Sequence, residues 1–166
     1  MREMTGLRNL VVDTIPAGGL PFYLLDAILS APQLCSIQFG PSICLPVEQD
    51  TSFPKRLRLT GPAPPITTFR RSLRSYQPYQ RTAAEADLLY RLFKQIHGTL
   101  QVAEMTSDTA PLRAFRDNDW PRLDELVLRG GPRRSSCAFV VENLTRMPNL
   151  RVLKLELAQP CGTDPR

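Results

Sequence analysis

The sequence predicts an α/β fold in which short parallel strands alternate with helices and stack one on the next. Three observations favour it. The pattern x-P-x-L-x-x-L-x-L recurs along the chain, its copies begin at similar intervals, and the segments between copies carry apolar residues at helical spacing. Consecutive strands in a parallel sheet need a crossover of about a dozen residues or more, and a helix commonly supplies it.

The pattern is clear at 31–39, 120–128 and 147–155, where only Ile37 and Phe39 replace leucine. A weaker copy opens the chain at Leu7, and degenerate copies lie at 57–59 and 100–105. The main copies are 27, 66, 23 and 27 residues apart, at Leu7, Leu34, Leu100, Leu123 and Leu150. Steps of 23 to 27 residues are typical of leucine-rich repeats, in which each unit is a short strand and a helix. We therefore expect an irregular leucine-rich-repeat solenoid.

Four helices are predicted between these strands. The first precedes Pro32 and contains Leu24, Leu25, Ile28 and Leu29. The best defined follows the capping-box pair Thr82 and Glu85 and presents Ala86, Leu89, Leu92, Phe93, Ile96 and Leu100. A short one lies between Pro111 and Trp120, with Leu112 and Phe115 inward and Trp120 as a packing anchor. The last carries Cys137, Val140, Val141 and Leu144, with Ser135 or Ser136 as N-cap and Pro148 at its end.

Composition divides the chain into four segments. Repeats are expected over 1–60 and 82–160, a flexible basic insertion rich in Pro, Ser and Arg over 61–81, and a tail over 161–166. The net charge is +5, and the segment 51–84 alone carries +7 because it holds seven basic and no acidic residues, Lys55, Arg56, Arg58, Arg70, Arg71, Arg74 and Arg81. We interpret this basicity as a solvated loop; the alternative is a contact with RNA or an acidic surface.

Residue types that carry catalysis or bind metals are scarce. The four cysteines form no C-x-x-C pair and the chain has one histidine, His97, so a zinc site of common spacing is excluded. His97 precedes Gly98 at a helix end, where it is expected to face unpaired carbonyls. No nucleophile, phosphate-loop or dinucleotide motif is present. We expect no enzyme activity, no cofactor and no metal.

The residues between the strand leucines point away from the core, so stacked strands display them in ladders on one sheet face. The expected ladders are Asn9, Ser36, Arg56, Val102, Glu125, Val152; then Val11, Gln38, Arg58, Glu104, Val127, Lys154; then Asp13, Gly40, Thr60, Thr106, Arg129, Glu156. The mixture of charge signs favours a protein target over a phosphate backbone; ordinary solvated strand surface is the alternative at each position. The candidate binding residues are Val11, Gln38, Arg58, Glu104, Glu125, Val127, Arg129, Val152, Lys154 and Glu156.

The segments Trp120 to Gly130 and Met147 to Leu157 resemble the irregular leucine-rich repeats that follow the F-box in fungal F-box proteins. The resemblance is good over 112–160, fair over 7–40 and poor between. It implies the target-recognition part of a substrate receptor in a cullin-based ubiquitin ligase, and it brings no catalytic residue. In that family the F-box binds a Skp-type adaptor and the repeats hold the target.

The resemblance does not include the F-box. The chain starts on a repeat strand at Leu7, and 45–48 imitates an F-box opening without the apolar helix that should follow. A Skp-type adaptor is therefore expected as a partner only if an F-box lies upstream. Polar caps are not evident on the terminal units, which predicts a fragment, a truncated product or an oligomer. We expect a cytoplasmic or nuclear location and no membrane contact; a non-functional gene fragment is a further alternative.

Overall fold

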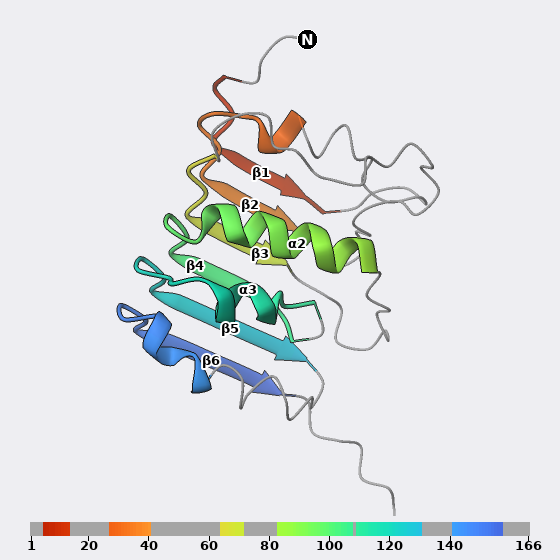
Figure 1. The fold of residues 1–166 in the computed structure, drawn as a ribbon. Coiled ribbons are helices and arrows are strands. Elements are labelled where there is room, and N and C mark those ends of the chain that lie inside the picture. Colours follow the sequence, from red (N-terminus) through yellow and green to blue (C-terminus); the bar gives the residue numbers. More distant parts are fainter. Residues whose placement is uncertain are drawn as a thin grey trace, which may run out of the picture.

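Six parallel strands form one sheet whose spatial order is the order of the chain (Figure 1). The computed structural model describes residues 5–13, 27–40, 64–71, 83–107, 109–130 and 141–157. The strands are β1 (Asn9–Val12), β2 (Ser36–Phe39), β3 (Thr68–Arg71), β4 (Val102–Thr106), β5 (Glu125–Gly130) and β6 (Val152–Leu157). The predicted α/β class with a parallel sheet is thus confirmed.

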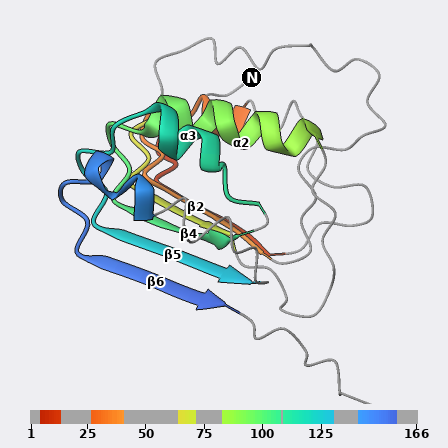
Figure 2. The ribbon, with the colours of Figure 1, turned by 60° about the horizontal axis from the view of Figure 1, so that its bottom comes forward.

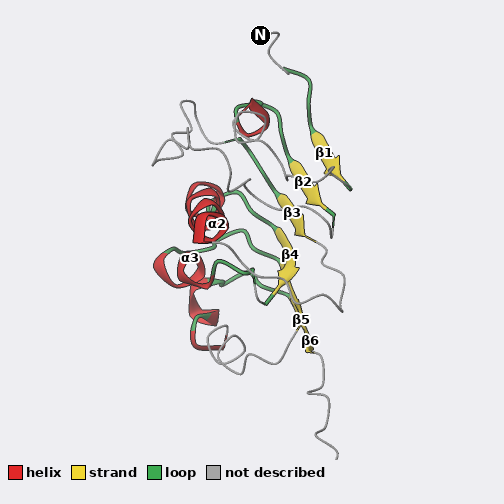
Figure 3. Cartoon of the chain, turned by 90° about the vertical axis from the view of Figure 1, so that its right-hand side faces the viewer, coloured by secondary structure: helices red, strands yellow, loops and turns green. Residues whose placement is uncertain are grey.

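The helices lie on one face of this sheet (Figures 2 and 3). They are α2 (Ala83–Ile96), α3 (Leu112–Asp117), a helical turn at residues 27–29 and the 3₁₀ helix η1 (Leu144–Arg146). We call this side the covered face and the opposite side the open face. Among the described residues no helix is long and apolar enough to cross a bilayer.

Alternation along each strand explains why one face is covered. In β5 the inward residues Leu126 and Leu128 are buried, as are Ala103 and Met105 of β4 and Ile37 and Phe39 of β2. In the four interior units the first apolar residue, Leu34, Ile66, Leu100 or Leu123, is also fully buried just ahead of its strand. The inward positions predicted for these units are confirmed.

Aromatic rings tie the helices to the middle of the sheet. Phe69 of β3 lies 6.1 Å from Phe39 and 5.0 Å from Phe93 of α2, between ring centroids, and both pairs meet edge to face. Phe93 continues the contact to Phe115 of α3 and to Trp120. Such pairs add about 0.5–1.5 kcal/mol each beyond burial of their area. Trp120 is fully buried, as predicted for a packing anchor.

One backbone hydrogen-bond pattern recurs at the start of the strands. The carbonyl of Arg8 accepts from the N–H groups of both Cys35 and Ser36, at 2.8 and 3.0 Å. The same pair of hydrogen bonds to one carbonyl joins each unit to the next, with N···O distances of 2.8–3.1 Å throughout. The residue involved always follows the first apolar residue of its unit. We call these the junction residues: Arg8, Cys35, Thr67, Gln101, Asp124 and Arg151.

The third strand lies elsewhere in the chain than predicted. The predicted strand near 57–59 lies outside the described residues, and the strand paired with β2 and β4 is Thr68–Arg71. The prediction that 61–81 is wholly a flexible insertion is therefore wrong at these residues. Pro64, Ile66, Phe69 and Arg71 stand where the pattern has proline and three leucines. The arginine at the third of these apolar positions concealed the copy, yet Arg71 is buried there with 1% exposure.

Several other predictions fall outside the described residues. These include most of the helix before Pro32, the segment 131–140 with the proposed caps Ser135 and Ser136, the F-box-like residues 45–48, and the tail 161–166. The predicted short helix after Pro111 is confirmed as α3, and the best-defined predicted helix is confirmed as α2.

Candidate interaction surface

Strand pairing brings most of the predicted binding residues into register on the open face of the sheet. Val11 pairs with Gln38, Glu104 with Val127, and Val127 with Lys154. Glu125 lies opposite Val152, and Arg129 lies opposite Glu156. These ladders depend only on strand alternation and parallel order, which is why the repeat pattern could predict them.

Arg58 is the exception among the candidate residues. It lies outside the described residues, and Arg70 of β3 occupies the position predicted for it, between Gln38 and Glu104. The ladder position predicted for Arg56 is likewise occupied by Thr68. The sequence does contain a signal for this assignment. Pro64-x-Ile66-x-x-Phe69 has the spacing of the repeat pattern, and it places the third strand after residues 57–59 in the chain.

The C-terminal half of the open face is a network of ion pairs. Glu104 bridges two guanidinium groups, with 3.7 Å to Arg70 Nε and 3.0 Å to Arg129 Nε. Arg129 also contacts Glu156 at 3.0 Å. Lys154 Nζ lies 3.4 Å from Glu125 Oε1. Three cations thus face three carboxylates, and the set carries no net charge.

This network shields a valine on the same face. Val127 has 3% exposure although it points away from the helices. Glu104 and Lys154 flank it across the sheet, and Glu125 and Arg129 flank it along β5. The long stems of such side chains cover apolar surface while their charged ends stay in water. Val127 is therefore inaccessible to a partner in this arrangement, contrary to its selection as a binding residue.

The N-terminal half of the open face has a different chemistry. Asn9, Val11, Ser36 and Gln38 carry no charge, and neither does Thr68 of β3. Val11 is 57% exposed, which is unusual for a large apolar residue in this fold. Apart from Asp13, which directly follows β1, the open face therefore changes along the sheet from neutral side chains to paired charges.

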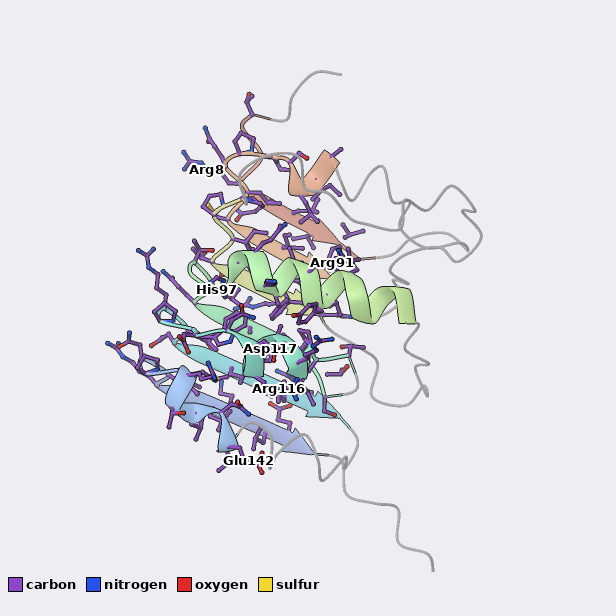
Figure 4. The ribbon with its side chains drawn as sticks, viewed as in Figure 1. Arg8, Arg91, His97, Arg116, Asp117 and Glu142 are labelled. Atoms are coloured by element: carbon purple, nitrogen blue, oxygen red, sulfur yellow. The ribbon has the colours of Figure 1, made fainter. Side chains whose placement is uncertain are left out.

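A second polar cluster lies on the helix side, at the exposed end of α3 (Figure 4). The carboxylate of Asp117 accepts hydrogen bonds from Arg116 Nε at 3.1 Å, Arg113 Nε at 3.2 Å and the Tyr90 hydroxyl at 3.3 Å. The Arg113 guanidinium also lies over the Tyr90 ring, 5.0 Å from its centroid. The hydrogen bond from Arg116, with that from Arg113, lowers the pKa of Asp117 although partial burial opposes it. This cluster joins α2 to α3 and needs no ligand.

His97 has the structural role expected from its position. Its Nδ1 lies 2.9 Å from the Lys94 carbonyl in the last turn of α2, and its ring meets Trp120 edge to face. In the part of the chain that the structure describes, no group of three His, Cys, Asp or Glu side chains could hold a metal ion.

Comparison with known proteins gives no relative. No protein-family model, curated protein or solved structure matches the chain. The open face and the helix-side cluster are therefore interpreted from their own geometry.

Proposed function

We propose that this chain is a non-catalytic protein-interaction module, an irregular leucine-rich-repeat solenoid that holds a protein target on the open face of its sheet. The observation that carries the proposal is the register of the six strands, which aligns outward side chains from every unit on one face. The junction residues support the repeat interpretation because each unit meets the next through the same pair of backbone hydrogen bonds.

The chemistry of this face suits a protein rather than a polyanion. Paired charges of both signs in the C-terminal half give geometric specificity without a field of one sign. The neutral half adds the exposed Val11 and the half-buried amide of Gln38. A target with a small apolar contact and a few polar groups matches both halves.

The alternative function, binding to RNA or an acidic surface, rests on seven basic residues, and two of these have structural contacts within the sheet. Arg71 is buried in β3, and Arg70 contacts Glu104. The other five, among them Arg58 and Arg74, lie outside the described residues. Salt separates the two functions: binding through phosphate contacts falls steeply between about 50 and 200 mM salt, whereas capture by the open face should change little.

The test is site-specific photocrosslinking in cells of the source organism. A benzophenone amino acid replaces Gln38 on the open face in one variant and Lys94 on α2 in its matched control. The proposal expects the same protein product from Gln38 and from a second open-face site, Val11, and none from Lys94. A product from Lys94 alone would place recognition on the helices and contradict the proposal.

The finer form of the proposal is target recognition in a ubiquitin-ligase receptor of F-box type. Its support is the resemblance of 120–130 and 147–157 to the repeats of that family. Pull-down of a purified Skp-type adaptor by the protein encoded by the full-length transcript tests it. Adaptor binding supports the receptor role; no binding restricts the proposal to an interaction module.

A further inference from the structure

The two edges of the sheet expose different peptide groups of their strands. Strand order places β1 at one edge and β6 at the other, and no described strand lies beyond either. In a parallel pair, alternate residues direct both peptide groups to one neighbour. Val152 N donates to Asp124 O, so the residues in phase with Val152 bond to β5. The N–H and C=O groups of Leu153 and Leu155 therefore point away from the sheet.

The same reasoning identifies the outer groups of β1. Ser36 N donates to Arg8 O and Gly40 N donates to Val12 O, so the residues in phase with these two carbonyls face β2. Asn9 and Val11 alternate with them. Their N–H and C=O groups point away from β2, toward the outside of the molecule.

These edges complement each other because of the junction residues. At each interior junction a carbonyl accepts from the first two N–H groups of the next unit. The Arg151 carbonyl holds that acceptor position beyond β6, and the N–H groups of Arg8 and Asn9 hold the donor positions beyond β1. We propose that β1 of one copy of this chain pairs with β6 of another, in parallel and in the register of β5 with β6. Asn9 would then lie opposite Val152, and Val11 opposite Lys154.

The side chains at the two edges also match. The inward apolar residues of interior units, such as Leu123, Leu126 and Leu128, have 0–1% exposure. Their equivalents in the first and last units are only partly buried: Leu7, Leu10, Val12, Leu150, Leu153 and Leu155. Pairing β1 of one copy with β6 of another brings these six side chains together on the covered face. They then bury one another as fully as the equivalent side chains of interior units are buried.

Charge sets the strength of this contact. In the proposed register Asp13 of one copy lies beside Glu156 of the other, and both side chains are exposed. Adjacent carboxylates weaken a strand pair, although Lys154 lies next to both. We therefore expect a weak, reversible association. The contact is made by the main chain of the two edge strands and needs no bound target, so this association and the proposed function can each fail while the other holds.

The contact is head to tail and leaves one free edge at each end of the pair. Such an interface grows as an open series rather than closing as a dimer, unless the strand twist completes a ring. Sedimentation velocity of the chain Met1 to Arg166 should show a mean mass that rises continuously with concentration from the monomer value of 18.7 kDa. A monomer at every concentration up to the millimolar range overturns the proposal.

Val11→Pro tests the edge directly. Proline removes one outward N–H and no bond to β2, and it is tolerated at sheet edges. The dissociation constant should rise at least about tenfold, and the variant should shorten wild-type assemblies when mixed with them because its β6 still binds. Val11→Ala is the matched control and should associate as wild type. Association unchanged in a Val11→Pro variant with native circular dichroism contradicts the proposal.

A charge exchange gives a second, independent readout if the proline variant fails to fold. Asp13→Lys places an ammonium beside Glu156 and should tighten association about threefold. Adding Glu156→Lys to it should remove that gain. Equal dissociation constants for the wild type and Asp13→Lys show that these residues do not meet, which also overturns the proposal.

Discussion

The two faces of β4 and β5 differ in chemistry. On the covered face the side chains are apolar and have 0–1% exposure: Ala103, Met105, Leu126 and Leu128. On the open face the alternate residues are the charged Glu104, Glu125 and Arg129, with Val127 buried among them. The same two strands therefore hold a dry apolar contact on one side and a hydrated ionic one on the other. Strand alternation therefore separates the side chains that stabilise the fold from those on the face that we propose for recognition. A change on the covered face should act on folding, and a change on the open face should act mainly on binding.

Trp120→Ala should give the largest loss. The indole is fully buried and meets Phe93, Phe115 and the ring of His97. Truncating a buried Trp or Phe to Ala costs about 3–5 kcal/mol through lost burial and the cavity left behind. Urea denaturation measures the free energy of unfolding, with Val11→Ala on the open face as control. A loss below about 1 kcal/mol would break the proposed division between the faces.

Gly40→Ala should have the next largest effect. Gly40 directly follows β2 and donates its N–H to Val12 O at 2.7 Å, and a Cβ at this position would overlap the Asp13 backbone. Because backbone must move, we expect a loss of about 1–3 kcal/mol in the free energy of unfolding. Gly6→Ala is the matched control, since a Cβ there meets nothing within 4 Å. Similar melting temperatures for the two variants would show that the β1 end adjusts without cost.

Glu104→Gln tests how much the ion pairs of the open face contribute to stability. It removes the carboxylate that bridges Arg70 and Arg129 while the side-chain shape is kept. Exposed ion pairs contribute at most about 1 kcal/mol, and salt screens them. The variant should therefore differ from wild type by up to about 1 kcal/mol at low salt and by less at 1 M NaCl. A difference independent of salt would indicate packing over Val127 as the main role of Glu104.

Asp117→Asn should have the smallest effect, and the effect should depend on pH. The hydrogen bonds from Arg116 and Arg113 lower the pKa of Asp117 in the folded chain below its ordinary value of 3.8. A lowered folded pKa stabilises the fold above pH 3.8 and loses that contribution as the pH falls through the folded value. The stability difference between wild type and variant should stay constant from pH 7 to 5 and shrink below pH 4. A difference that grows on acidification contradicts this assignment.

The repeat pattern predicted much of the fold because leucine at three fixed positions specifies both a strand and the side it buries. It predicted β1, β2, β4, β5 and β6, the helix α2, and the ladder pairings of β1 with β2, of β4 with β5 and of β5 with β6. It failed at β3, where Arg71 occupies an inward position that the pattern reserves for an apolar residue. Burial of a guanidinium depends on partners elsewhere in the chain, and spacing alone does not reveal them.

The candidate surface was predicted less fully than the fold. Register follows from alternation, so the sequence correctly places Gln38, Glu104 and Lys154 in one ladder. The ion pairs depend on side-chain direction between neighbouring ladders, as in the diagonal contact of Arg129 with Glu104. The shielding of Val127 follows from these pairs. Neither the ion pairs nor the shielding of Val127 can be predicted from the pattern of a single strand.

The junction residues have a consequence for how such a chain changes over generations. Each joins its neighbour through main-chain atoms, and the six positions hold Arg, Cys, Thr, Gln, Asp and Arg. Such a linkage does not require a particular side chain, so most substitutions leave it intact, and proline is the exception because it lacks the N–H that donates. It also leaves the length of each crossover unconstrained, which agrees with successive units that differ in span. Lineages could therefore gain, lose or lengthen whole units by duplication or deletion, and the neighbouring units would join again through the same two hydrogen bonds.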